Sequence, residues 1–461
     1  MTEKEMPLVE QAKTVLDFNW TGEYTRPGPR LYPHQWSWDS ALISLAYARY
    51  APEKAVRELS HLFGAQWENG LLPQIVFNPD FAAYFPDASF WHADESPAAP
   101  TNARTSGIVQ PPFHATAVLA LWEKAGEDPS VRRFCEDAIP RLAAWHDYLY
   151  RERDPKGEYL VYIRHPWESG MDNSPMWDAI MEGIFLSPAD VPTYKRADTH
   201  VVSAADRPES AEYDRFAYLV KLFADREYDE ARIREDCPFL VQDVLFNALL
   251  VRAGRDLGRL AGAFGEDPSP HEERAEKTAR AINEKLWDER RGTYLGFDLV
   301  ADSPIRVLAS PNFVPLYAGV PDREQASAMV DNLSSRSFSL AEGAGVPVPS
   351  YDRMGFGFSP TRYWRGPVWI NIDYFLMHGL RRYGYEKQAN LLKKTIVRLC
   401  RDEGFYEYFD PADGRGHGSD LFSWTAALLI DVLAEERQDD TTKAGPNPAA
   451  GQSRQHQKAD G

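Results

Sequence analysis

Cysteine is scarce in this sequence of 461 residues, and it occurs only as Cys135, Cys237 and Cys400. Three widely separated cysteines argue against a disulfide framework and against a zinc site. No run of about eighteen apolar residues exists, so no membrane-spanning helix is predicted. The opening segment, MTEKEMPLVEQAK, lacks the apolar centre of a signal peptide. We therefore expect a cytoplasmic protein that does not bind a membrane.

Sequence motifs for bound cofactors are also missing. The eleven histidines include no pair four residues apart on a predicted helix, so we expect no catalytic metal. There is no glycine-rich phosphate loop, no Gly-x-Ser-x-Gly elbow and no dinucleotide fingerprint. We expect the protein to work without a cofactor.

Positively charged residues are outnumbered: the sequence has 51 Lys and Arg residues and 69 Asp and Glu residues, for a net charge of −18. This balance argues against nucleic acids and anionic membranes as partners. An anionic substrate would therefore need a locally cationic pocket. Aromatic residues, by contrast, are abundant, with 13 Trp, 22 Tyr and 23 Phe. Many stand beside Pro, Gly, Asp or Arg and away from helical stripes, which favours contact surfaces on loops.

The apolar residues recur mainly with helical spacing. Predicted helices cover residues 38–50, 52–66, 113–126, 130–151, 210–226, 239–263, 270–287, 322–333, 366–383, 386–402 and 420–436. This number of helices fits a toroid of inner and outer helices, and equally a helical repeat or an irregular bundle. No fixed repeat period is present, which weighs against a solenoid. The segments 67–112, 152–209, 288–321 and 334–365 are longer than ordinary connections, and we expect them to carry function.

The most informative stretch is residues 165–178, His-Pro-Trp-Glu-Ser-Gly-Met-Asp-Asn-Ser-Pro-Met-Trp-Asp. Its prolines, tryptophans and glycine indicate a stiff loop and not the interior of a helix. Carboxylates among aromatic faces are costly to bury for stability alone, whereas a sugar offers apolar C–H faces and hydroxyl groups to such a surface. A sugar site is one interpretation. The other is a Trp-anchored turn whose aspartates cap the following helix.

Within this stretch, Glu-Ser-Gly-Met-Asp-Asn-Ser resembles the loop motif of (α/α)6-barrel glycosidases, namely the trehalases and the family 63 glycoside hydrolases. Within family 63 the chain is similar to the bacterial glucosylglycerate and mannosylglycerate hydrolases, over residues 32–424. The resemblance implies an all-α fold, an (α/α)6 barrel or toroid, in one catalytic domain covering residues 1–437. It also implies that loops at about 67–112, 152–209 and 334–365 cap the active site. Residues 438–461 are polar and rich in Gly and Pro, and we expect a disordered tail.

The family pattern implies two catalytic carboxyl groups. The aspartate after Gly-Met, Asp172, matches the general acid. The glutamate of Gly-Phe-Tyr-Glu-Tyr-Phe-Asp-Pro, Glu407, matches the general base. Burial between aromatic rings would raise the pKa of such a carboxyl group unless it is hydrogen-bonded.

Other acidic residues compete for these roles. Glu168 is the main alternative within the central loop, and Glu403 and Asp410 are the alternatives to Glu407. We expect Asp178, six residues after Asp172, to cap or brace the next helix.

The resemblance also marks the residues that would hold the substrate. In Tyr-Pro-His-Gln-Trp-Ser-Trp-Asp at 32–39, an extended segment would point Trp36 and Trp38 to one side and Asp39 to the other. The alternative is that Asp39 caps a helix starting at Ser40. The implied substrate-binding set is Tyr32, Trp36, Trp38, Asp39, Tyr84, Gln110, Trp167, Gly170, Arg207, Tyr213, Tyr363, Trp364 and Trp369.

Several of these residues fit structural roles equally well. Gln110 stands before two prolines, which hold it extended and fix the direction of its amide. Tyr84 suits a packed loop anchor as well as a sugar contact. In Tyr-Trp-Arg-Gly-Pro-Val-Trp at 363–369, a structural role for Trp369 is as plausible as a ligand contact. Arg365 would bind a carboxylate or brace the loop.

Arg207 carries the prediction about the substrate. Next to a proline and six residues before Tyr213, it suits a carboxylate clamp, and alternatively a surface pair with Glu209 or Glu212. In the glucosylglycerate hydrolases the matching Arg and Tyr bind the glycerate group. The resemblance therefore favours a glycerate glycoside over trehalose.

We expect an inverting glycoside hydrolase that cleaves the α-glycosidic bond of glucosylglycerate, mannosylglycerate or both. Alternatives are a trehalase-like enzyme, an oligosaccharide α-glucosidase and a sugar epimerase, although an epimerase would need a histidine pair and none is obvious. A sugar-binding protein on a decayed barrel is disfavoured because both carboxyl groups are present. The sequence leaves open the gluco or manno preference and whether the protein is a homo-oligomer.

Overall fold

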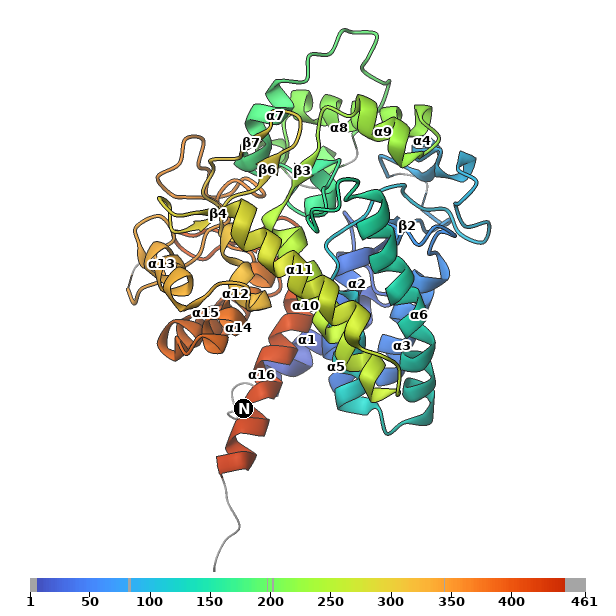
Figure 1. The fold of residues 1–461 in the computed structure, drawn as a ribbon. Helices are drawn as coiled ribbons and strands as arrows, with labels where there is room; N and C mark the ends of the chain where they lie inside the picture. Colours follow the sequence, from blue (N-terminus) through green and yellow to red (C-terminus); the bar gives the residue numbers. More distant parts are fainter. Residues whose placement is uncertain (1–5, 82–83, 197, 201–202, 344, 444–461) are drawn as a thin grey trace, which may run out of the picture.

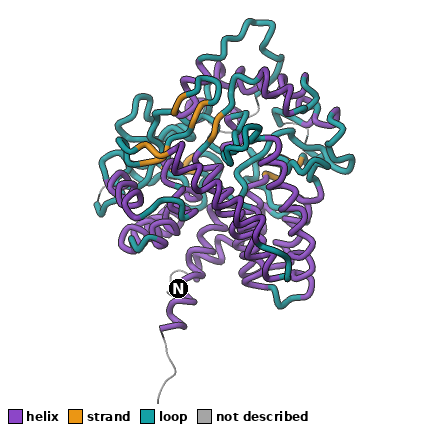
Figure 2. The backbone as a smooth tube through the Cα atoms, viewed as in Figure 1, coloured by secondary structure: helices purple, strands orange, loops and turns teal. Residues whose placement is uncertain are grey.

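The protein is described from a computed structural model, which covers residues 6–81, 84–196, 198–200, 203–343 and 345–443. Most of this part of the chain is helical (Figure 2). Within it, six helices form a closed inner ring, because each packs on the next and the last packs on the first. Around the ring they are α2 (Ser37–Tyr50), α5 (His114–Ala125), α10 (Val244–Ala263), α12 (Pro315–Ala318), α14 (Ile370–Arg382) and α16 (Ser423–Lys443).

A second layer of helices covers this ring from the outside (Figure 1). These outer helices are α1 (Met6–Asn19) on α16, α3 (Pro52–Gly64) on α2, α6 (Pro129–Glu152) on α5, α11 (Ser269–Ala281) on α10, and α15 (Glu386–Asp402) on α14. The helix α13 (Arg323–Ser334) packs against strand β5 (Thr293–Tyr294). Outer and inner helices alternate along the chain, which is the (α/α)6 toroid, so the predicted fold class is confirmed.

Local sequence signals set the helix starts. Asp128 accepts hydrogen bonds from the backbone N–H groups of the first turn of α6, and Pro129 occupies its first position. Asp243 caps α10 by accepting from the N–H of Phe246 at 2.8 Å. Most faces of α10 are buried, as an inner helix requires. The buried apolar side chains form one continuous cluster from Leu8 to Leu433.

Each predicted helix is present, but some limits were wrong. The helix predicted from 239 starts at Val244, because residues 241–242 form a strand and Asp243 is the cap. The prediction missed α1 and the four-residue α12, and the helix predicted at 210–226, α8 (Ser210–Asp225), lies outside the ring. Helix α16 continues to Lys443, and residues 444–461 of the predicted tail lie outside the described residues.

The connections explain why one end of the toroid is capped. Each link from an inner helix to the following outer helix is short, whereas each link from an outer to an inner helix is long. The long loops therefore meet at the N-terminal ends of the inner helices (Figure 1). They contain α4 (Ala88–Trp91), α7 (Asp178–Glu182), α8 and α9 (Glu230–Asp236).

Short antiparallel strand pairs tie these loops together. The two-stranded pairs are β1 (Gln35–Trp36) with β2 (Ile75–Val76), β4 (Trp287–Asp288) with β5, and β8 (Tyr408–Phe409) with β9 (Gly416–His417). In a three-stranded sheet, β6 (Phe297–Asp298) pairs with β3 (Val241–Gln242) on one side and with β7 (Ser303–Pro304) on the other. Across the described residues, no helix combines the length and the apolar character needed to cross a membrane.

Candidate active site

A pocket lies among the cap loops, at the N-terminal ends of the inner helices. Helix starts contribute to its wall, because Trp38 and Asp39 lie in the first turn of α2 and Trp369 immediately precedes α14. The residues that sequence reasoning selected for catalysis or binding all line this pocket: Tyr32, Trp36, Trp38, Asp39, Tyr84, Gln110, Trp167, Gly170, Asp172, Arg207, Tyr213, Tyr363, Trp364, Trp369 and Glu407.

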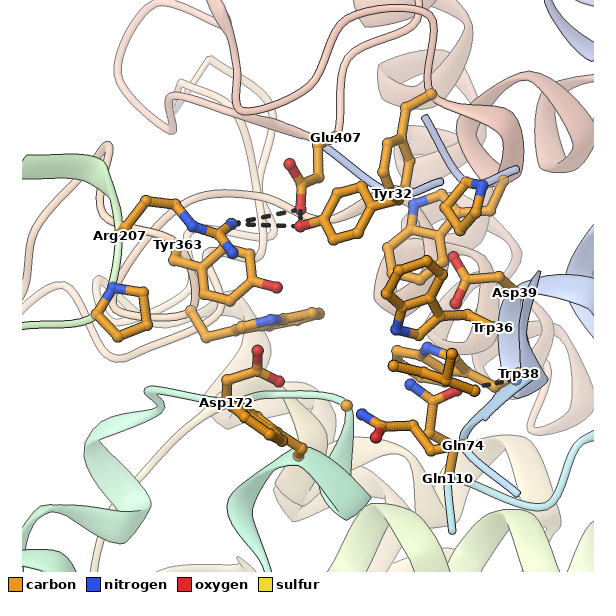
Figure 3. Close-up of a pocket in the computed structure, with 18 of the residues that line it drawn as sticks. Tyr32, Trp36, Trp38, Asp39, Gln74, Gln110, Asp172, Arg207, Tyr363 and Glu407 are labelled. Carbon is orange, nitrogen blue, oxygen red and sulfur yellow. Dashed lines mark hydrogen bonds and ion pairs between the residues drawn. The ribbon is translucent and has the colours of Figure 1, made fainter. Parts of the chain in front are cut away.

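Sequence reasoning missed several residues of the same wall. Trp424 meets the ring of Trp38 edge to face at 5.3 Å between centroids. Gln74 lies on the same side as Gln110 (Figure 3). A glutamine in a loop and a tryptophan at a helix start both have ordinary structural explanations, so they were left out of the predicted set. The unpredicted lining residues are Pro27, Gln74, Ile75, Pro86, Pro208, Phe422 and Trp424.

Two carboxyl groups face one another across the pocket. Asp172 and Glu407 lie on opposite sides of the open space in Figure 3. Asp172 stands between two short helical turns, η2 (Pro166–Ser169) and η3 (Pro175–Trp177), and Glu407 directly precedes β8. The stiff loop and the strand hold the two groups on separate, independently anchored segments.

The two ends of the pocket differ in chemistry. Trp36, Trp38 and Gln110 lie at one end in Figure 3, and Arg207 and Tyr363 lie at the other. The first end offers flat apolar faces with an amide, which suits a sugar ring. The second end offers a guanidinium group, which suits an anion. The two carboxyl groups lie between these ends.

Glu407 is buried and firmly held. The Tyr32 hydroxyl donates to its Oε1 at 2.6 Å, and the backbone N–H of Ser419 donates to its Oε2 at 2.9 Å. Arg207 Nη1 lies 3.9 Å from Oε1. Burial raises the pKa of Glu407, while Arg207 and these hydrogen bonds oppose the rise. Gly418 has a φ of +74°, and a Cβ there would collide with Oε2, so only glycine fits behind the carboxylate.

The pKa of Asp172 is raised as well. Burial raises its pKa to about 7, and the charge of Glu407 adds to the rise. Arg207 and the Tyr363 hydroxyl lower the pKa in part. A large fraction of Asp172 therefore carries a proton near neutral pH, whereas Glu407 is supported as a carboxylate by its donors. One carboxyl group is suited to give a proton and the other to take one.

The backbone at Trp36, Trp38 and Asp39 differs from the prediction. Trp36 belongs to strand β1, but the helix starts at Ser37 and not at Ser40, so Asp39 is not its cap. The change from strand to helix turns all three side chains into the pocket. Asp39 is buried, and burial together with the charges of Glu407, Glu58 and Asp172 raises its pKa well above the usual range.

Arg207 is buried and faces the pocket, with 6% of its surface exposed. Its Nε donates to Asp198 Oδ2 at 3.2 Å and its Nη1 to the Tyr32 hydroxyl at 3.3 Å. The guanidinium lies over the ring of Tyr363 at 4.2 Å. Arg196 also binds Asp198 through both carboxylate oxygens, at 3.0 and 2.7 Å. Two guanidinium groups thus share one carboxylate, so Asp198 does not fully neutralise Arg207.

The alternative role for Arg207, a surface pair with a neighbouring glutamate, is wrong. Arg362 takes those partners, at 2.9 Å from Glu209 and 3.2 Å from Glu212. Tyr213, the other predicted member of the clamp, lines the pocket and donates through its hydroxyl to the carbonyl of Phe85 at 3.1 Å.

Glu168, the main alternative catalyst, does not line the pocket. It is fully buried, and Arg153 donates to both of its oxygens at 3.0 Å. The backbone N–H groups of Arg164 and Val109 donate to the same carboxylate, at 2.7 and 3.2 Å. Because its oxygens are occupied by these donors, Glu168 anchors the loop that carries Asp172 and cannot reach substrate.

The other acidic alternatives lie outside the pocket as well. Asp178, which was predicted to cap or brace the next helix, is the first residue of α7 and accepts two hydrogen bonds from Arg365, at 2.7 and 2.6 Å, so it braces the start of that helix. Asp410 accepts from the backbone N–H of Ala412 at 2.7 Å, which makes it a turn residue. Glu403 is exposed at the end of α15.

Several lining residues combine structural and pocket-facing roles. Trp369 stacks on Trp364 with ring centroids 3.7 Å apart, so both are packed and both line the pocket. Gln110 accepts from the backbone N–H of Trp38 at 3.2 Å. Gly170 has a φ of +73°, and a Cβ there would collide with the Trp38 ring. The loop therefore packs directly on the tryptophan wall.

The fold and the pocket define the class of protein. The pocket lies at the N-terminal ends of the inner helices of an (α/α)6 toroid. It holds two opposed carboxyl groups between a tryptophan wall and a guanidinium group. This arrangement is that of a glycoside hydrolase. Among the described residues, no group of three or more His, Cys, Asp or Glu side chains could hold a metal ion.

Comparisons with known proteins place the chain within that class. Residues 32–425 match the model of the "Mannosylglycerate hydrolase MGH1-like glycoside hydrolase domain", and the chain belongs to this family. It is 78% identical to a mannosylglycerate hydrolase of Rubrobacter radiotolerans over 93% of this chain and 97% of that one. It is 35% identical to a glucosylglycerate hydrolase of Mycolicibacterium hassiacum, over 92% and 97% of the two chains.

A solved structure agrees with these matches. The family 63 mannosylglycerate hydrolase of Thermus thermophilus, in complex with Tris and D-glycerate, superposes with a TM-score of 0.86. The two proteins are 41% identical, over 93% of this chain and all of the other. The predicted family is therefore confirmed.

Proposed function

We propose that this protein hydrolyses the α-glycosidic bond of mannosylglycerate with inversion of configuration. The observation that carries the proposal is the opposition of Asp172 and Glu407 between the tryptophan end and the Arg207 end of one pocket. The name of the Rubrobacter relative and the glycerate bound to the Thermus relative support the choice of substrate.

The geometry suggests a division of labour. The tryptophan end would hold the sugar ring, which places the glycosidic oxygen near Asp172. Asp172 donates its proton to that oxygen while Glu407 takes a proton from water. The water oxygen attacks the anomeric carbon from the face opposite the leaving group, the carbon–oxygen bond breaks, and glycerate departs. Asp172 then regains a proton and Glu407 loses one to solvent.

Arg207 would bind the glycerate carboxylate. Its Nε and Nη1 are already engaged, but Nη2 makes no hydrogen bond to the described residues. Asp198 divides its negative charge between Arg207 and Arg196, and Glu407 lies 3.9 Å from Nη1, so Nη2 is the donor that remains for a ligand. An anionic substrate group would bind at Nη2, in a chain that is otherwise strongly acidic.

Glucosylglycerate is the second candidate substrate, because the Mycolicibacterium relative bears that activity in its name. Glucose and mannose differ in the orientation of one hydroxyl group, which a hydrogen-bonding site can read strongly.

A substrate panel with stereochemical readout tests the proposal. We expect mannosylglycerate to be hydrolysed with the highest kcat/KM, glucosylglycerate next, and trehalose hardly at all. NMR of the first-formed sugar should show the β-anomer, because water attacks the face opposite the leaving group. Appearance of the α-anomer first would refute inversion, and preference for trehalose would refute the glycerate assignment.

The second prediction concerns the anionic half of the substrate. Arg207→Ala should lower kcat/KM for mannosylglycerate by roughly 10- to 150-fold, the usual cost of losing a charge-assisted hydrogen bond. The uncharged analogue mannosylglycerol should lose far less. Because Arg207 also lowers the pKa of Glu407, both substrates are compared on the pH plateau of the variant.

Arg362→Ala is the matched control for that experiment. Arg362 braces the same loop through Glu209 and Glu212 but does not line the pocket. We expect it to affect both substrates equally and mildly. If Arg207→Ala also lowered both substrates equally, Arg207 would be a loop brace and the clamp would be rejected.

A further inference from the structure

Glu58, on the outer helix α3, is a fully buried carboxyl group that does not line the active-site pocket. Among the described residues, no Lys, Arg or His side chain forms an ion pair or a hydrogen bond with its carboxylate. Burying a carboxylate without a cation lowers the stability of the fold. An uncharged side chain would avoid that cost, so stability alone does not explain a carboxyl group at this position.

Four hydrogen-bond donors surround the Glu58 carboxylate. The backbone N–H and the hydroxyl of Thr25 both donate to its Oε2 at 2.7 Å. The Ser40 hydroxyl donates to its Oε1, and the Gln35 amide nitrogen lies 3.4 Å from the same oxygen. An ionised carboxylate can accept from all four, whereas an amide must present two N–H groups on one side. Burial raises the pKa of Glu58 to about 7, and these hydrogen bonds oppose the rise.

The Gln35 amide is held in one orientation from two sides. Its Nε2 donates to the backbone carbonyl of Glu58 at 2.8 Å, and its Oε1 lies 2.6 Å from Nδ1 of His61. Since an amide oxygen can only accept, His61 is the donor in that contact. Turning the Gln35 amide to suit a different side chain at position 58 would therefore break both contacts.

Two of the residues that bind Glu58 stand beside residues of the tryptophan end of the pocket. Gln35 immediately precedes Trp36 in β1, and Ser40 immediately follows Asp39 in the first turn of α2. Glu58 thus binds the strand and the helix turn on either side of the point where the backbone changes from β1 to α2. The relative position of Trp36 and Asp39 depends on that junction.

Thr25 ties a third segment to the same carboxylate. It stands two residues before Pro27, which lines the pocket and whose carbonyl accepts from the backbone N–H of Ser423 at 2.8 Å. Every residue that donates to the Glu58 carboxylate is therefore one or two positions from a residue of the pocket wall. This arrangement is the kind of supporting contact that a binding site needs, because binding groups must be held within roughly 0.5 Å of their productive geometry.

We propose that Glu58 is a positioning residue for the tryptophan end of the pocket, where its carboxylate sets the spacing between β1 and the first turn of α2. Trp36 and Asp39 can then contact one sugar ring together. The inference rests on the proposed function, in which this end holds the sugar. Glu58 touches no substrate atom and acts through Gln35 and Ser40.

Calorimetric titrations with mannose and, separately, with D-glycerate test the inference at about pH 8, above the pKa of Glu58. Glu58→Gln should weaken mannose binding by roughly 10- to 100-fold, because the amide N–H groups meet two donors and displace the sugar wall. D-Glycerate binding should match wild type, because none of the groups that bind the Glu58 carboxylate belongs to the Arg207 end. A purely structural role would change the two affinities of the folded protein alike, or neither.

Ser40→Ala is a milder second variant, which removes one donor and leaves the carboxylate in place. It should show the same selective loss of mannose affinity, smaller in size. Adding it to Glu58→Gln should weaken mannose binding little further, because the two residues act through one contact. Glu53→Gln is the matched control, since it makes the same change at an exposed position of α3, and it should bind both ligands like wild type.

Mannose binding by Glu58→Gln like that of wild type, or equal losses of mannose and D-glycerate affinity, would overturn the inference. If Glu58→Gln does not fold, the same two outcomes are read from Ser40→Ala. Wild type that binds no mannose would also overturn it, because there would be no sugar site to position. Wild type that binds mannose but does not hydrolyse mannosylglycerate would reject the proposed function and leave the role of Glu58 standing.

Discussion

Asp172→Asn should reduce kcat by about 10²- to 10⁴-fold while the affinity for mannosylglycerate stays close to wild type. The amide keeps the shape of the side chain but cannot give a proton to the glycosidic oxygen. The leaving glycerate oxygen would then depart as an unprotonated alkoxide, which is a poor leaving group. Steady-state kinetics measure kcat, and calorimetry with the inactive variant measures substrate affinity.

The pH profile supplies a second readout for the same residue. A general acid works only when protonated, and the pKa of Asp172 is raised to about 7. Wild-type activity should therefore fall as the pH rises through about 7, and the residual activity of Asp172→Asn should lack that decline. Asp178→Asn is the matched control, because it is the same change on the same loop outside the pocket. An active Asp172→Asn beside an inactive Asp178→Asn would reverse our assignment.

Glu407→Gln should be equally damaging, with a loss of about 10²- to 10⁴-fold in kcat. Glutamine cannot accept the proton of the attacking water, and it removes the negative charge beside Arg207. The acidic limb of the wild-type profile should lie above the usual range for a glutamate, because burial raises the pKa of Glu407. The rate falls as the pH drops through that value, since the base must be ionised.

Glu403→Gln is the control for the base. Glu403 stands shortly before Glu407 in the sequence but is exposed and lies outside the pocket. It should retain nearly full activity and keep both limbs of the profile. Substantial turnover by Glu407→Gln, with its acidic limb unchanged, would show that another group activates the water.

Features of the fold that depend on neighbouring residues could be predicted from the sequence, whereas features that depend on distant segments could not. Helical spacing located the long helices except α1, because the apolar stripe of a helix recurs in consecutive turns of the sequence. It missed α12, since four residues contain barely one turn and no periodicity can be seen. It also placed the start of α10 too early, because the apolar residues before Asp243 continue the pattern while forming a strand.

The charged residues show the limit most clearly. Glu168 and Asp172 stand in one loop and are chemically alike, so sequence chemistry alone could not rank them as catalysts. In the structure, the Glu168 carboxylate accepts hydrogen bonds from Arg153 and from two backbone N–H groups, whereas Asp172 faces the pocket. In the same way, Arg207 could have paired with Glu209, but Arg362 from a distant loop takes that partner.

By itself, the sequence determined the helical class, the long loops and the residue types suited to a sugar, because these depend on spacing and side-chain chemistry along a short stretch. The resemblance of its motifs pointed to Asp172 and Glu407. Only the tertiary structure decided that these two carboxyl groups face one another and that Trp38 and Arg207 occupy opposite ends of one pocket. The physical reason is that burial and charge pairing, which set pKa and partner, depend on segments that meet only when the ring of helices closes.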